Sequence, residues 1–258
     1  MGNVGAQAFP SPQAIERYLP WGGVLRGFRW GRSSDVALLL HDPGADVDAW
    51  GPLPVEIARQ LEIETVAVDL PGHGLSDDPW EPERLRDLLR DLPEIAPAEG
   101  LQFLIAAGDS AIAALELASA IELSGLICLS PQIPRDGWRP PRSPRVPKLC
   151  VAGSLAGGDL DDARRLASAS GGWVVVTSYP VAERGTLLLA SRWGDRLVEE
   201  IVAFLRDCQR RPAHAGLAAD RTRPGSPSAP RGRPPSSIPK PGTSGGSSGE
   251  AVKSFEGG

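Results

Sequence analysis

Short runs of Val, Ile, Leu and Ala alternate along most of the chain with longer stretches whose apolar residues recur at helical spacing. Runs that are apolar throughout are typical of parallel strands covered on both faces, and the amphipathic stretches between them are typical of the covering helices. We therefore predict an α/β fold with a mostly parallel sheet flanked by helices. The expected strands are 35–41, 65–70, 102–107, 125–130, 148–152 and 173–179, with an edge strand near 25–30.

The expected helices follow from Pro placement and from the spacing of apolar residues. Pro52 suits the first turn of a helix, where its missing N–H costs nothing. The last helix carries one apolar face, made by Leu197, Val198, Ile201, Val202 and Leu205. The Pro- and Arg-rich segment 131–147 has room only for an irregular loop, so we expect no lid domain and a site open to solvent. The expected helices are 52–61, 82–92, 110–121, 159–170 and 195–206.

Composition changes sharply near residue 209. Beyond it Pro, Gly, Ser and Ala dominate, which predicts a disordered tail over 209–258 after an N-terminal extension (1–24) and one folded domain (25–208). The tail carries eight Lys or Arg against three Asp or Glu, a net +5; the whole chain carries −5, so residues 1–208 carry −10. An acidic domain argues against a specific nucleic-acid site. The basic tail reads as a solvated linker or as a segment that binds an acidic partner.

The cysteines indicate neither a disulfide framework nor a metal site. Cys128 and Cys150 lie within apolar runs, so we expect buried thiols, and no CxxC spacing suggests zinc. We expect no cofactor. The N-terminus lacks a basic-then-apolar signal, and no run of about 18 apolar residues could form a transmembrane segment. These observations predict a cytoplasmic protein.

Three stretches carry a family resemblance, each directly after an expected strand. Residues 41–44 (HDPG) are similar to a His-Gly-x-Gly oxyanion loop, 69–76 (DLPGHGLS) closely match a D-x-P/R-G-H-G-x-S turn, and 108–110 (GDS) lead into a helix as a nucleophile elbow does. In this order they resemble the α/β-hydrolase superfamily, here a lidless, esterase-like member with a degenerate catalytic triad. The resemblance implies acyl transfer by a nucleophile, a base, an acid and backbone oxyanion donors.

The resemblance assigns the nucleophile to Ser110, which follows Gly108 as in G-x-S-x-G, although Ile112 replaces the second small residue. A second register centres on Asp109, as in the branch whose nucleophile is an aspartate. A third interpretation leaves Ser110 as a helix cap, a position that Ser favours.

The base and the acid are both replaced. The loop 181–186 (VAERGT) has Arg184 where the family has His, and a guanidinium stays protonated and cannot accept a proton. His41 and His73 fall at positions that are structural in the family. The acid position falls at Ala156, and the carboxylates of the nearby helix start, Asp159, Asp161 and Asp162, either substitute for the acid or favour the helix dipole.

The oxyanion loop has also changed. Pro43 stands where a residue would offer its N–H, and Asp42 brings negative charge to a place where negative charge must develop. Ala111 is then the remaining backbone donor.

Together these replacements favour a hydrolase-fold protein that is non-catalytic or severely impaired and that binds a small acyl or anionic ligand in its cleft. The alternative is an active, carboxylesterase-like serine hydrolase that uses Ser110 and a base not recognised in the sequence. A third hypothesis places the binding function in the tail.

Overall fold

The computed structural model describes residues 11–20, 22–77, 100–134 and 145–211 of the chain. Within them, eight strands form one sheet in the order β1-β2-β4-β3-β5-β6-β7-β8. The strands are β1 (Gln13–Tyr18), β2 (Val24–Trp30), β3 (Val36–Leu40), β4 (Glu64–Val68), β5 (Leu101–Ala107), β6 (Gly125–Leu129), β7 (Lys148–Gly153) and β8 (Val174–Tyr179). The helices are η1 (Val47–Trp50), α1 (Leu53–Leu61), α4 (Asp109–Leu117), α5 (Asp159–Ala169), α6 (Leu187–Ala190) and α7 (Gly194–Arg210).

The sheet is parallel from β4 through β8, and only β1 and β2 run antiparallel to their neighbours. Each parallel strand therefore ends at the same edge of the sheet. The central strands β3 and β6 are buried at every position, as their uninterrupted apolar sequences predict. The expected mostly parallel sheet with flanking helices is confirmed.

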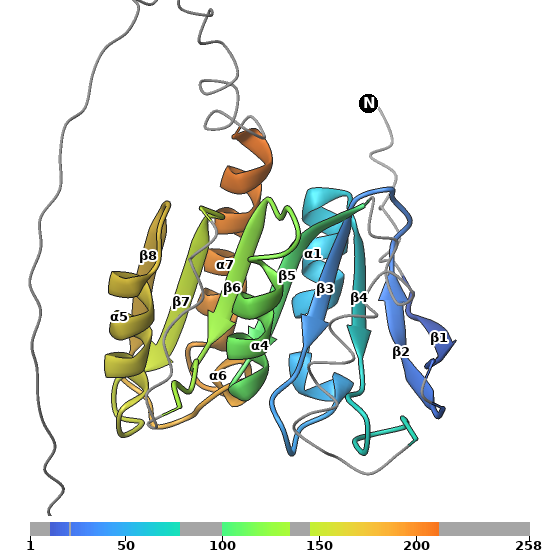
Figure 1. Ribbon diagram of the computed structural model, residues 1–258, viewed down its shortest axis with the longest axis horizontal. Helices are drawn as coiled ribbons and strands as arrows, with labels where there is room; N and C mark the ends of the chain where they lie inside the picture. The colour runs from blue at the N-terminus through green and yellow to red at the C-terminus, as the bar shows by residue number, and fades with distance from the viewer. Residues whose placement is uncertain (1–10, 21, 78–99, 135–144, 212–258) are drawn as a thin grey trace, which may run out of the picture. The chain divides into compact units, whose positions relative to one another are not determined.

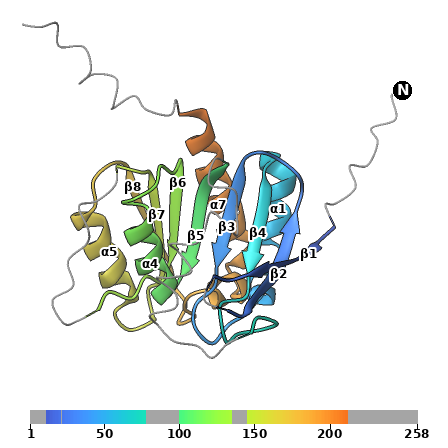
Figure 2. The same ribbon diagram turned by 45° about the vertical axis from the view of Figure 1, so that its right-hand side comes forward.

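Helices cover both faces of the sheet. One core contains side chains of α4 and α5 packed on the sheet, and the other contains side chains of α1, α6 and α7. Figures 1 and 2 show α4 and α5 on one side of the strands and α1 and α7 on the other. The apolar stripe of α7 is buried as expected, and the interior of α4 from Ala111 to Leu115 is buried almost completely.

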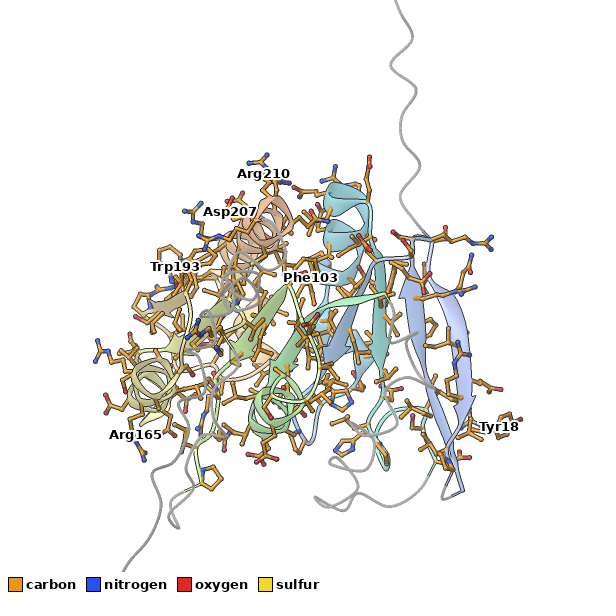
Figure 3. All side chains as sticks on the ribbon, turned by 45° about the horizontal axis from the view of Figure 1, so that its top comes forward. Tyr18, Phe103, Arg165, Trp193, Asp207 and Arg210 are labelled. Atoms are coloured by element: carbon orange, nitrogen blue, oxygen red, sulfur yellow. The ribbon has the colours of Figure 1, made fainter. Side chains whose placement is uncertain are left out.

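The structure differs from the expectation at the N-terminal edge. The segment that we assigned to an extension contains β1, which pairs along its whole length with β2. Its pattern is weak because Ile15 alone is buried, whereas Tyr18 is 80% exposed and projects into solvent (Figure 3). An edge strand with one buried residue offers little hydrophobic periodicity. The last helix, α7, also runs through Gln209 and Arg210, beyond the expected start of the tail at 209. The expected helix 82–92, most of the loop 131–147 and residues 212–258 of the expected tail lie outside the described residues.

The three cysteines are free thiols, and Cys128 and Cys150 are completely buried, as expected. Burial raises the pKa of Cys208 to about 12, and contact with the neighbouring Cys150 and burial raise the pKa of Cys128. None of the described helices has the length and apolar character needed to cross a membrane.

Candidate functional site

The residues with candidate chemical roles meet at the carboxyl edge of the sheet. His41 and Asp42 follow β3, Gly108 follows β5, and the loop containing Arg184 follows β8. Because parallel strands end at the same edge, residues far apart in the sequence come into contact there. Asp42 and Thr186, which are 144 positions apart, are joined by two hydrogen bonds.

The sharp turn between β5 and α4 lies at Gly108. This residue has φ +57° and ψ −127°, a conformation that L residues rarely adopt, and the helix begins at the next residue. In a nucleophile elbow, the strained residue of the strand-to-helix turn carries the nucleophile. Here that residue is glycine and has no side chain. Residues two positions to either side, Ala106 and Ser110, are both small, as the elbow requires.

Ser110 lies inside the first turn of α4 and is completely buried. Its Oγ donates a hydrogen bond of 2.7 Å to the main-chain oxygen of His41. The hydroxyl therefore ties α4 to the end of β3. It is not a helix cap either, because the N-cap residue is Gly108 and no side chain caps this helix.

The space beside the turn is filled by Asp42. A Cβ atom at Gly108 would lie 2.8 Å from the Cβ of Asp42, and one at Gly185 would lie 2.6 Å from its Oδ2. Neither distance is tolerated between non-bonded atoms. Oδ1 accepts hydrogen bonds from the N and Oγ1 atoms of Thr186, at 3.0 and 2.8 Å. A carboxylate from the β3 loop thus lies between the elbow and the β8 loop.

Arg184 is paired with Asp159, at the start of α5. Its Nε lies 2.9 Å from Oδ2, and its second terminal nitrogen bonds Oδ1, so the contact is bidentate. The Asp159 side chain is 1% exposed and that of Arg184 is 47% exposed. Hydrogen bonding to Asp159 raises the pKa of Arg184 above its ordinary value. The guanidinium is permanently charged and already bound by a buried carboxylate.

This ion pair joins the two loops that the resemblance assigns to acid and base. Ala156, at the expected acid position, is a buried residue without a carboxyl group. Asp162 instead bonds Ile133 N and Arg165. The two loops pack closely because Gly153 leaves room for main-chain oxygens of the β8 loop: a Cβ there would lie 2.6–2.7 Å from them.

His41 is completely buried and bound to main chain through both ring nitrogens. Nε2 accepts from Leu70 N at 2.9 Å, so Nδ1 carries the hydrogen and donates to Asp42 O, also at 2.9 Å. Burial lowers the pKa of His41 below its ordinary value of 6.5. The ring is neutral and holds the β3 and β4 loops together.

The turn after β4 is built in the same way. Its carboxylate, Asp69, is 1% exposed and accepts from Val47 N and Leu75 N, each at 2.8 Å. His73 Nε2 accepts from Gly44 N at 2.9 Å, and its Nδ1 contacts Pro71 O at 3.0 Å. These polar groups satisfy backbone atoms of two adjacent loops, which is a structural role.

The expected oxyanion donors are compromised. Pro43 has no N–H, and the N–H of Ala111 donates to Gly108 O at 3.2 Å within the turn. Asp109, the other candidate nucleophile, is an exposed residue at the start of α4. Partial burial of its carboxyl group raises its pKa, and the negative charge of Asp42 raises it further, whereas the positive charge of Arg184 lowers it. Two carboxylates thus lie beside the start of α4. Among the described residues, no three His, Cys, Asp or Glu side chains are grouped to hold a metal ion.

Comparisons with known proteins identify the fold. No family model matches the chain, and no curated protein is similar to it in sequence. Solved structures do match. A predicted CIB-like hydrolase from Thermoplasma acidophilum has a TM-score of 0.63 and 15% identity, covering 77% of this chain and 99% of that one. The esterase Pf2001 from Pyrococcus furiosus has a TM-score of 0.58 and 15% identity, covering 80% and 94%.

An α-β serine hydrolase homologue from Coxiella burnetii also matches, with a TM-score of 0.56 and 17% identity, covering 76% of this chain and 96% of that one. At these identities the likeness establishes the fold. The chain has the α/β-hydrolase fold over nearly the full length of the structures that it matches.

Sequence reasoning placed Arg184, Asp42 and Pro43 at this site, and the structure brings Arg184 together with Asp159 and Asp42 together with Thr186. It missed the roles of Gly108, Gly185 and Thr186. One signal was available for Gly108: shifting the elbow by two residues removes the conflict with Ile112 and puts small residues on both sides of the turn.

Proposed function

We propose that this chain is an α/β-hydrolase-fold protein that does not perform serine-dependent acyl transfer and whose carboxyl edge binds rather than cleaves. The observation that carries this proposal is the position of the sharp turn at Gly108. A turn without a side chain presents no hydroxyl, thiol or carboxylate to a substrate. The nearest hydroxyl in the sequence, Ser110, is buried and bonded to His41 O.

The surroundings of the turn support the same proposal. The side chain at the base position, Arg184, stays protonated and is engaged by Asp159. Both ring nitrogens of His41 are committed to main-chain atoms, so this ring does not serve as a base. Losing a base typically lowers the rate by about a hundred- to ten-thousand-fold, and losing one oxyanion donor by about a hundred- to a thousand-fold.

The competing function is a serine ester hydrolase that uses Ser110. Its support is the likeness in fold to proteins described as esterases and hydrolases. It requires Ser110 to leave its bond with His41 O and to find a base near α4.

Labelling by a fluorophosphonate reagent separates the two functions. We expect the wild-type chain to remain unlabelled under conditions in which an active serine hydrolase is labelled completely. Hydrolysis of p-nitrophenyl acetate should be equal for the wild type and for Ser110→Ala. Rapid labelling at Ser110, together with turnover that Ser110→Ala abolishes, would establish the esterase and refute our proposal.

A further inference from the structure

The contacts of Asp42 describe a bound carboxylate rather than a solvated side chain. Its Oδ1 accepts two hydrogen bonds from one residue, Thr186, whose N lies 3.0 Å and Oγ1 2.8 Å away. Thr186 is 1% exposed, so both donors are removed from water. A buried donor that loses its acceptor is costly, so this pair of groups requires an acceptor oxygen, and an anionic oxygen forms the stronger hydrogen bonds.

The space around the carboxylate is shaped by two glycines. A Cβ at Gly185 would lie 2.6 Å from Oδ2 and 2.8 Å from Oδ1 of Asp42, and a Cβ at Gly108 would lie 2.8 Å from its Cβ. Both glycines also have positive φ, +54° and +57°. The carboxylate thus occupies a recess beside the main chain of the two glycines, and a side chain at either position would enter that space.

We propose that this recess is a carboxylate-binding site whose ligand is the chain's own Asp42. The recess takes a small carboxylate, with one oxygen on Thr186 and the rest of the group against Gly185 and Gly108. This inference rests on the proposed function, because only an elbow without a side chain leaves room for the carboxylate. It goes further by naming the chemical class that the recess accepts once the side chain of Asp42 is shortened.

The charges around the recess are mixed. Arg184 and Asp109 both act on this region: the charge of Asp42 raises the pKa of Asp109 and that of Arg184 lowers it. Selectivity for a carboxylate therefore depends on the two donors of Thr186 more than on net charge. Asp42 itself is only half-buried, so we expect the space left by a shortened side chain to be open to a small solute.

The test is chemical rescue of truncated variants, followed by thermal unfolding. Asp42→Ala removes only the carboxylate group, so formate matches the missing atoms. Asp42→Gly removes the methylene as well, so acetate matches. We expect both variants to have a lower Tm than the wild type. At ten times its Kd, each matched anion should raise the Tm of its variant by about 3–6 °C relative to chloride at equal ionic strength.

The wild-type chain provides the first control, because Asp42 already fills the recess: formate and acetate should act on it no differently from chloride. Asp42→Ala/Thr186→Val is the matched control, since it keeps the recess but removes the hydroxyl donor, and its response to formate should fall at least fivefold. Equal responses to formate and chloride in a folded Asp42→Ala chain would refute the proposal, and so would an undiminished response in the double variant.

Asp42→Asn covers the case in which the truncated variants do not fold. Asn keeps one carbonyl oxygen for Thr186, and we expect amide exchange at Thr186 to accelerate about tenfold or less in this variant. Acceleration to the rate of an unprotected amide would contradict the assigned contact. These readouts are independent of fluorophosphonate labelling, so a labelled Ser110 would overturn the proposed function while formate rescue would still report on the recess.

Discussion

Two sets of loops at the same sheet edge differ in how closely they match the hydrolase pattern. The turn after β4 retains the sequence DLPGHGLS, and its carboxylate, Asp69, bonds backbone atoms of two loops. The turn after β5 has a glycine at its strained position, and the loop after β8 has Arg184, which is paired with Asp159. The difference indicates that the most recognisable motif in this chain determines loop geometry, whereas the proposed lack of acyl transfer rests on residues of the other two loops.

The first prediction tests whether Asp69 holds the turn after β4 in place. Replacing Asp69 with Ala leaves the buried N–H of Val47 and the partly buried N–H of Leu75 without their acceptor, and a buried donor without an acceptor costs about 1–3 kcal/mol. We expect a loss of about 3–5 kcal/mol in the free energy of unfolding, measured with denaturant. Asp77→Ala, which removes an exposed partner of Arg26, should cost less than about 1 kcal/mol. Similar losses for the two variants would show that Asp69 does not hold the turn.

The second prediction concerns the elbow. Gly108→Ser restores a hydroxyl to the turn, but its Cβ would meet Asp42 and its backbone would be strained at φ +57°. We expect a loss of about 2–3 kcal/mol in stability and no gain in ester hydrolysis. Adding Asp42→Gly should recover part of the loss. A Gly108→Ser chain as stable as the wild type would mean that Asp42 does not fill this space.

The third prediction concerns the ion pair between Arg184, at the expected base position, and Asp159. Arg184→Ala leaves Asp159 buried without its partner, at a cost reduced by the 47% exposure of Arg184. We expect a loss of about 1–2 kcal/mol by denaturant unfolding. Arg165→Ala, which breaks an exposed pair with Asp162 on α5, should cost about 0.5 kcal/mol or less. The pair would have no structural role if the two losses were equal.

The fourth prediction concerns how the free energy of unfolding depends on pH through His41. Because burial lowers the pKa of His41, the unfolded chain binds a proton at this residue before the folded chain does. The contribution of His41 is therefore complete above the unfolded pKa of 6.5 and is lost as the pH falls towards the folded pKa. We expect a loss of at most about 1 kcal/mol between pH 7 and pH 5.5, the limit that the unfolded pKa sets. The same pH change should affect His41→Gln less; an equal slope would assign the effect to other groups.

The sheet and its helices were predictable from their burial. Central strands are buried on both faces and read as apolar runs, and helices are buried along one stripe and read as apolar residues at helical spacing. The elbow was harder to place. Residues 104–115 (LIAAGDSAIAAL) are almost all small or apolar, so their pattern does not mark where β5 ends. The end of the strand depends on its pairing with β6, in which Ala107 lies opposite Leu129. That tertiary contact places the turn at Gly108 rather than at Ser110.

The ion pair was only partly predictable, for a similar reason. Arg184 was identified by its place in the loop, and Asp159 was one of three carboxylates at the start of α5. Only the packing of the β7 and β8 loops through Gly153 selects Asp159, because it brings that carboxylate, buried at 1% exposure, against the guanidinium. Contacts between loops 25 positions apart have no periodic signature.

The close approach of Asp42 to Gly108 and Gly185 links any change at the turn to changes in the neighbouring loops. A side chain at the elbow is obstructed until Asp42 is shortened, a shortened Asp42 strands the donors of Thr186, and an imidazole at position 184 deprives Asp159 of its counter-charge. We therefore expect each of these single replacements to lower the stability of the fold. The three positions are coupled through packing and hydrogen bonds, so a nucleophile and an imidazole could be installed here only by several simultaneous replacements.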